Sequence, residues 1–203
     1  MADTKISALT ALAGTDVDTG VDSLAIVDDS VTTTKKILAE QLRIALRPVI
    51  GTTATTTSGA THDFTSIPAG TRRIVMSFSG VSTDGSSPLI IQIGDSGGVE
   101  ATGYLGAASN LSTVVATLNF TTGFGVMQGT ASTTVVHGSV ELTLLDSATN
   151  LWSARSVIGW SSSAVTSVGG GSKALSGTLD RVRLTTVNGT DAFDAGSVNI
   201  QYQ

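Results

Sequence analysis

The chain has 203 residues, a net charge of −5, only 13% charged residues, two histidines and no cysteine. These numbers exclude a disulfide framework and a thiolate metal site, and a net negative chain without basic clusters is unsuited to binding nucleic acid. No run of 18 apolar residues could span a membrane, and no signal peptide is evident, so we expect assembly in a reducing cytoplasm.

The first fifty residues predict a small clip. Residues 23–28 form a short apolar run that suits a strand, and residues 28–30 are a turn signal. The β-branched run at 31–37 suits the returning strand. A short helix is predicted next, on a stripe made by Leu38, Leu42, Ala45 and Leu46, and Pro48 disfavours its continuation.

A low-complexity tract at residues 51–60, rich in Thr and Gly, separates two different compositions. Residues 1–50 contain no aromatic side chain, whereas the remainder holds all nine. Such a polar tract is either a linker or an extended edge segment. We therefore predict an N-terminal module at 1–50, a linker at 51–61 and a β-domain at 62–203.

The second half predicts strands separated by turns. Apolar residues alternate with polar ones at Ile74, Met76 and Phe78. Strands are predicted at 74–79, 89–93, 112–118, 133–145, 151–160, 179–186 and 197–202. Turn signals lie at 83–85, 94–98, 146–150, 169–172 and 188–189. The fold class predicted is mainly β, an antiparallel sandwich of the jelly-roll kind behind a small hairpin-and-helix segment.

The string Gly94-Asp95-Ser96-Gly97-Gly98 resembles the nucleophile loop of trypsin-like serine proteases. Catalysis there needs a histidine and an aspartate placed by a preceding barrel. His62 lies only 34 residues before Ser96, which leaves no room for such a barrel. A glycine-rich turn after a strand is the favoured interpretation, a serine hydrolase built on Ser96 is the weakest of our hypotheses, and we predict no enzyme.

The remaining chemistry is sparse. His62 and His137 do not make a metal site within one chain, although a trimer could gather three copies of one histidine on its axis. The acidic pairs at 16–18 and 28–29 lack the spacing of an EF-hand loop. We therefore predict no metal and no cofactor.

Trp152 and Trp160 lie eight residues apart, so they share one face of a continuous strand. Exposed tryptophans stack on sugars, and buried ones fill a core. The core is the favoured interpretation. If the pair and Tyr104 were exposed, these three rings would be the candidate contacts for a glycan.

Three strings near the N-terminus occur in order, at 4–14, 23–28 and 32–37, and a short helix is predicted after them. Together they resemble the N-terminal module of virion proteins of tailed bacteriophages, mainly tail-fibre, head-fibre and capsid-decoration proteins. In the second half, residues 66–70 and 91–98 look like β-sandwich regions of phage particle proteins.

The resemblance implies a homotrimer on the virion surface, with an anchoring N-terminal half and an outward β-domain. The short chain favours a protein that decorates or cements the capsid; the alternative is a tail-fibre, spike or head-fibre protein that binds a host-surface glycan. The partners would be the major capsid protein or tail proteins of the same particle. The anchoring contacts are predicted at Ile6, Leu9, Leu12, Leu24, Ile26, Lys35, Lys36, Ile37 and Leu42.

Overall fold

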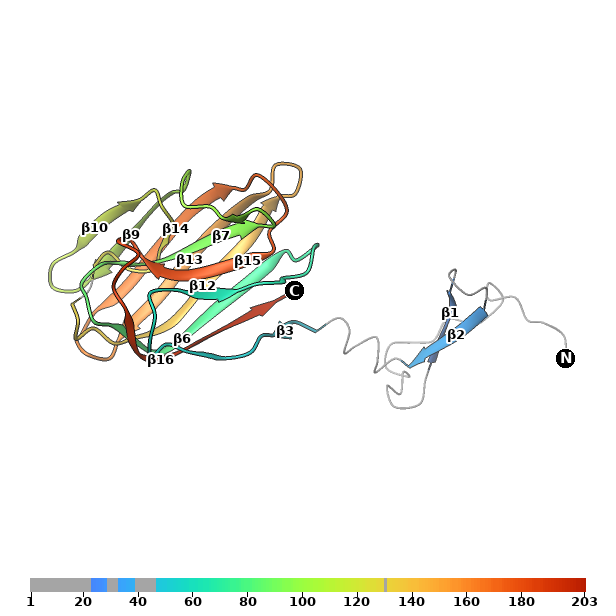
Figure 1. Ribbon diagram of the computed structural model, residues 1–203, viewed down its shortest axis with the longest axis horizontal. Helices are drawn as coiled ribbons and strands as arrows, with labels where there is room; N and C mark the ends of the chain where they lie inside the picture. The colour runs from blue at the N-terminus through green and yellow to red at the C-terminus, as the bar shows by residue number, and fades with distance from the viewer. Residues whose placement is uncertain (1–22, 29–32, 39–46, 130) are drawn as a thin grey trace, which may run out of the picture. The chain divides into compact units, whose positions relative to one another are not determined.

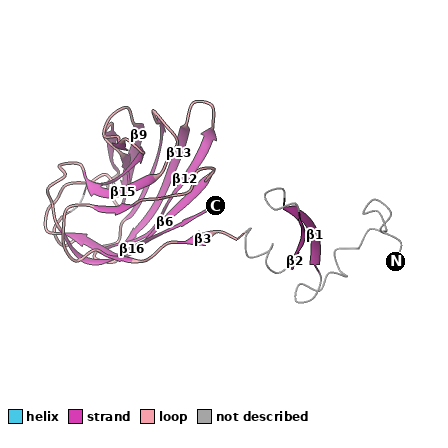
Figure 2. Cartoon of the chain, turned by 45° about the vertical axis from the view of Figure 1, so that its right-hand side comes forward, coloured by secondary structure: helices cyan, strands magenta, loops and turns pink. Residues whose placement is uncertain are grey.

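The structure is a computed structural model that describes residues 23–28, 33–38, 47–129 and 131–203. The chain divides into two compact units, Met1–Arg47 and Pro48–Gln203. In the described part the chain forms strands and loops only (Figure 2). The prediction of a mainly β, antiparallel protein is therefore confirmed.

The first unit contains the predicted hairpin. Strand β1 (Ser23–Asp28) pairs antiparallel with β2 (Thr33–Leu38), and Leu24 lies opposite Ile37. Leu38 ends β2, whereas the rest of the predicted helix falls outside the described residues. The same holds for four predicted anchoring positions, namely Ile6, Leu9, Leu12 and Leu42.

The second unit is built on a nine-stranded antiparallel sheet with the order β10-β9-β14-β13-β12-β6-β16-β3, in which β4 also pairs with β16 (Figure 1). Its strands are β3 (Val49–Ile50), β4 (Ala54–Thr55), β6 (Arg73–Thr83), β9 (Leu105–Leu111), β10 (Ala116–Phe120), β12 (Val136–Asp146), β13 (Leu151–Trp160), β14 (Thr166–Ala174) and β16 (Phe193–Tyr202).

A smaller, five-stranded sheet lies against the inner face of the large one. Its order is β11-β7-β15-β5, with β8 on β7, and its strands are β5 (His62–Phe64), β7 (Leu89–Asp95), β8 (Gly98–Val99), β11 (Phe124–Gly125) and β15 (Arg181–Thr186). In Figure 1, β7 and β15 cross in front of β12 and β13. Both sheets supply side chains to one buried core.

The period-two pattern of the sequence accounts for this core. Ile74, Met76 and Phe78 on β6 point inward, and the residues between them are more exposed. Leu89, Ile91 and Ile93 point into the same core from β7, but the residues between them are buried as well, because Ile90 packs in a second, smaller cluster on the other face. On β6, where alternate residues are buried, a slip of one position would expose the whole apolar set.

Two predicted elements are wrong. In place of the strand expected at 112–118, the chain has a turn after β9 and the first residues of β10, because the Ser112 hydroxyl bonds the backbone of Val114 and reverses the chain. The turn expected at 169–172 lies inside β14. A side chain at Gly169 would come within 2.8 Å of the Gly125 carbonyl oxygen, so glycine permits close packing there.

Residues 51–56 lie along the sheet as an edge segment, the second of the two alternatives for this tract. The Gly51 N–H donates to the Ile200 carbonyl over 2.8 Å, and the Thr56 N–H donates to the Gly196 carbonyl over 2.9 Å. The Thr56 side chain is fully buried and donates to the Ala195 carbonyl. This part of the predicted linker therefore belongs to the fold of the second unit.

Candidate interaction surface

The Gly94–Gly98 string is the turn of a tight hairpin between β7 and β8, with Ser96 exposed at its tip. Asp95 accepts a hydrogen bond from the Gly97 N–H over 2.8 Å and another from the Ser176 hydroxyl over 2.9 Å. A Cβ atom at Gly94 would lie 2.1 Å from the Gly98 carbonyl oxygen. The turn therefore explains Gly94 and Asp95 of the motif, and Ser96 lies at its exposed tip.

The two histidines lie in different sheets. His62, on β5, packs edge-on against Phe193, and burial lowers the pKa of its imidazole against the opposing effect of Asp63. His137, on β12, accepts a hydrogen bond from the Gly80 N–H and bonds the Ser161 hydroxyl. Neither histidine bonds Ser96, and the part of the chain that the structure describes holds no cluster of three His, Asp or Glu side chains suited to a metal ion.

The three aromatic residues considered for glycan contact are structural. Tyr104 is 1% exposed, accepts the Ile93 N–H and donates to the Glu100 carbonyl over 2.9 Å, and burial raises the pKa of its phenol. Trp152 is 2% exposed in the core. Trp160 is half-buried and donates its indole N–H to the Ser167 hydroxyl. Tyr104 and Trp152 thus offer no exposed ring face for a sugar, and the core interpretation holds for both.

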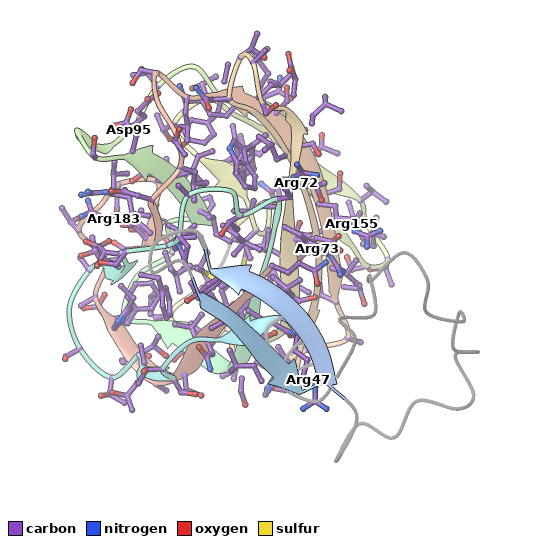
Figure 3. The ribbon with its side chains drawn as sticks, turned by 90° about the vertical axis from the view of Figure 1, so that its right-hand side faces the viewer. Arg47, Arg72, Arg73, Asp95, Arg155 and Arg183 are labelled. Atoms are coloured by element: carbon purple, nitrogen blue, oxygen red, sulfur yellow. The ribbon has the colours of Figure 1, made fainter. Side chains whose placement is uncertain are left out.

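Charged side chains are unevenly distributed over the second unit. The small sheet carries Arg183 paired with Asp63 over 2.6 Å and Arg181 paired with Asp180 over 2.7 Å. On the outer face of the large sheet, Glu141 bridges Arg73 and Arg155 in one cluster, and Asp146 and Asp194, at the ends of β12 and β16, are also exposed. Figure 3 shows Arg73 and Arg155 on one side of the molecule, with Arg183 and Asp95 on the other.

Exposed apolar side chains gather beside that cluster. Seven of the eleven large apolar residues with exposed side chains lie on β9, β10, β13, β14 and the turn between β9 and β10. We call them the apolar patch: Leu105, Leu111, Val114, Val115, Leu118, Val157 and Val168. Leu105 is 72% exposed and Val114 is 74% exposed. Val157 and Val168 are paired on the outer face of the sheet, whereas Leu118 lies opposite the buried Ala108 and so faces the inner side at the edge. Exposed apolar side chains gathered at one end of a sheet often mark an interaction site.

The backbone of the edge strand at this end of the large sheet could also pair with another chain. β10 is the outermost strand of the large sheet on this side, and its sequence from Ala116 to Phe120 contains neither a charged residue nor a proline. Proteins ordinarily protect exposed edge strands with lysine, proline or bulges. The absence of these features from β10 adds to the indication that another chain covers this corner.

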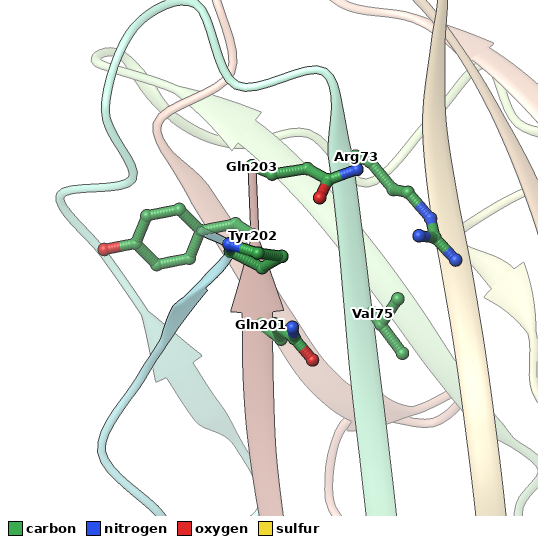
Figure 4. A pocket seen from close by; sticks show the side chains of 6 residues that line it. Arg73, Val75, Gln201, Tyr202 and Gln203 are labelled. Atoms are coloured by element: carbon green, nitrogen blue, oxygen red, sulfur yellow. The ribbon is translucent and has the colours of Figure 1, made fainter. Parts of the chain in front are cut away.

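A hollow of about 260 Å³ opens at the opposite edge of the large sheet (Figure 4). Val75, Gln201 and Tyr202 line it together with Arg73. The Arg73 guanidinium donates to Glu141 over 2.7 Å, so the one cation of the hollow is already engaged. We therefore consider the apolar patch a better candidate for an interaction site than this hollow.

The sequence alone located neither the apolar patch nor its bare edge strand. The sequence signal for the apolar patch was the run Val114-Val115, close to Leu111. We interpreted this run as part of a strand at 112–118. Of the predicted anchoring positions, the structure places Leu24, Ile26, Lys35, Lys36 and Ile37 on the paired strands β1 and β2. Within the described residues, no helix is long and apolar enough to cross a membrane.

No known protein family matches this chain, and no curated protein or solved structure is significantly similar to it.

Proposed function

We propose that the protein is a non-enzymatic structural component of a tailed bacteriophage particle, a homotrimer that decorates or cements the capsid. The resemblance of residues 4–46 to virion-attachment modules supports this proposal. On this view the second unit is a β-sandwich of the jelly-roll kind that faces outward, and the chain is made in the host cytoplasm before joining the virion.

The observation that carries the proposal is the apolar patch beside a nearly uncharged sheet face. Burying apolar surface is favourable by about 25 cal/mol per Å², so a patch of seven aliphatic side chains favours association. Ser, Thr and Val dominate the surrounding outer face, and such a face can approach a copy of itself without charge repulsion. In a trimer this face would pack against a different surface of the neighbouring subunit, because rings of three close through heterologous contacts.

The β1–β2 hairpin is the proposed attachment element. It would add its short strands to an exposed edge on the major capsid protein, or on a tail protein of the same particle. Leu24 is paired with Ile37, and Ile26 with Lys35, so apolar and basic residues occur at neighbouring positions of the two strands. Each contact alone would be weak, but three copies in one trimer would raise retention through their effective concentration.

Two measurements test the proposal. Sedimentation of the full-length protein should show a trimer, and electron microscopy of intact particles should show its density at repeated positions on the capsid. A protein that sediments as a protomer and is absent from the particles would refute it. Density confined to the tail would instead favour the fibre or spike alternative.

A further inference from the structure

Three loops of the second unit meet around a hollow of about 200 Å³. They are the segment before β6, the hairpin between β12 and β13, and the segment before β15. Arg72 comes from the first, Ser147 and Asn150 from the second, and Thr178 from the third. The ring of Trp152 and the side chain of Leu179 form part of its apolar floor.

Of the polar side chains of this hollow, those of Arg72, Ser147 and Thr178 are exposed and that of Asn150 is half-buried. Within the described part of the chain, Arg72, Ser147, Asn150 and Thr178 make no side-chain hydrogen bond or ion pair. The indole N–H of Trp152 has no hydrogen-bond partner there either, whereas that of Trp160 is satisfied by Ser167. Four polar residues whose side chains have no partner in the described part of the chain therefore line one small space, together with Trp152.

Arg72 stands apart from the other cations of the second unit. Arg72 has no carboxylate partner among residues 48–129 and 131–203. The other five cations of this part each contact a carboxylate: Arg73, Arg155, Lys173, Arg181 and Arg183. Its backbone is nonetheless fixed, because its N–H donates to the Gln203 carbonyl and its own carbonyl accepts the Leu144 N–H, both over 2.8 Å. A fixed position beside unengaged donors suits a guanidinium that receives an anion.

The one acidic group in the adjoining hairpin does not compete for Arg72. Asp146 accepts hydrogen bonds from the Ala148 N–H and from the Thr149 hydroxyl. These bonds lower the pKa of its carboxyl and commit both of its oxygens to the turn. The local cation is therefore left for a ligand from outside.

We propose that this hollow binds a small saccharide that carries a carboxylate, such as a hexuronate. Arg72 would bind the carboxylate, and Ser147, Asn150, Thr178 and the Trp152 indole would bond the hydroxyl groups. The hollow is smaller than the roughly 300–1,000 Å³ that drug-sized ligands occupy, which limits it to a single sugar ring. Trp152 and Leu179, which are 2% and 3% exposed, would close the floor beneath that ring without offering it a stacking face.

The test uses the full-length protein with ¹⁵N-labelled tryptophan, which gives two indole resonances. Titration with D-glucuronate should shift the Trp152 resonance and leave that of Trp160 in place. D-glucose and acetate, which lack the carboxylate and the ring respectively, should shift it much less. Calorimetry should show that Arg72→Ala weakens glucuronate binding about tenfold or more, as expected for a charged hydrogen bond.

Arg155→Ala is the matched control, since it removes the same charge from the outer face of the large sheet and should leave binding unchanged. If Arg72→Ala does not fold, Ser147→Ala and Thr178→Val should each weaken binding severalfold. An unmoved Trp152 resonance, equal responses to acetate and glucuronate, or equal losses in the Arg72 and Arg155 variants would overturn the proposal. None of these outcomes depends on whether the protein is a trimer or sits on a capsid.

Discussion

At the scale of single residues, Glu141 is the charge that organises the outer face of the large sheet. Hydrogen bonds from Arg73 and then Arg155 lower the pKa of its carboxyl from 4.5 to about 2. A carboxyl whose pKa is lower in the folded state stabilises the fold above its unfolded pKa. That stabilisation is lost as the pH falls from 4.5 toward about 2.

We therefore expect Glu141→Gln to lower the free energy of unfolding at neutral pH. The difference from the unsubstituted protein should shrink as the pH falls through the same interval, because protonated Glu141 no longer attracts the arginines. Urea unfolding followed at several pH values measures both curves. Parallel curves across that interval would show that the bridge does not contribute to stability.

The hairpin at Gly94–Gly98 allows a second test at the same scale. Gly94→Ala should destabilise the fold by about 1–3 kcal/mol, since the new methyl group would collide with the Gly98 carbonyl. Ser96→Ala, two residues away on the exposed tip, should change stability by less than about 0.5 kcal/mol. Thermal unfolding of the two variants compares them directly. A large loss from Ser96→Ala would mean that the serine has a role beyond the turn.

At the scale of elements, local patterns in the sequence predicted strands where one face is buried. The strand at 151–160 was predicted with its observed ends, and its buried residues Trp152, Ser156 and Ile158 lie on one face. The strand at 112–118 was wrong because Val114 and Val115 favour β-structure locally, while a hydroxyl-to-backbone turn decides the conformation. The turn predicted from the glycine run at 169–172 was wrong. This part of β14 needs glycine because segments distant in sequence pack closely against its backbone.

The apolar patch predicts which strands join the subunits. Val157 on β13 lies directly opposite Val168 on β14, and both side chains are exposed. Val157→Lys should raise the dissociation constant of the trimer about tenfold or more, because a charge would be buried without a partner. Sedimentation equilibrium of the full-length protein measures the change.

Val187→Lys is the control for this prediction. Val187 is also exposed, but it follows β15 in the small sheet and lies outside the apolar patch. The trimer should be as stable in this variant as in the unsubstituted protein. If both lysines weaken association equally, the effect is one of net charge and the patch is not the contact.

At the scale of the whole molecule, the composition led us to expect that other subunits cover part of the surface, but it did not indicate which part. A charge content of 13% is low for a soluble domain, whose surface normally carries about a quarter charged residues or more. Only the pairing order of the strands shows which charges lie together, as in the Glu141 cluster of the large sheet and the two ion pairs of the small one. The sequence could not predict that the polar residues around Arg72 line one hollow either, since they come from three loops distant in sequence.

The division of the chain into two units predicts separable stability and attachment. Residues 48–203 contain the whole described core, so this fragment should unfold cooperatively. The thermal unfolding midpoint of the fragment should lie within about 4 °C of that of the second unit in the full chain. A change of ~1 kcal/mol in the free energy of unfolding shifts the midpoint by this much in a domain of this size. The fragment should nevertheless fail to bind particles that lack the protein, whereas the full chain binds them. Co-sedimentation with such particles measures retention, and a fragment retained as well as the full chain would place the anchor in the β-domain instead of the β1–β2 hairpin.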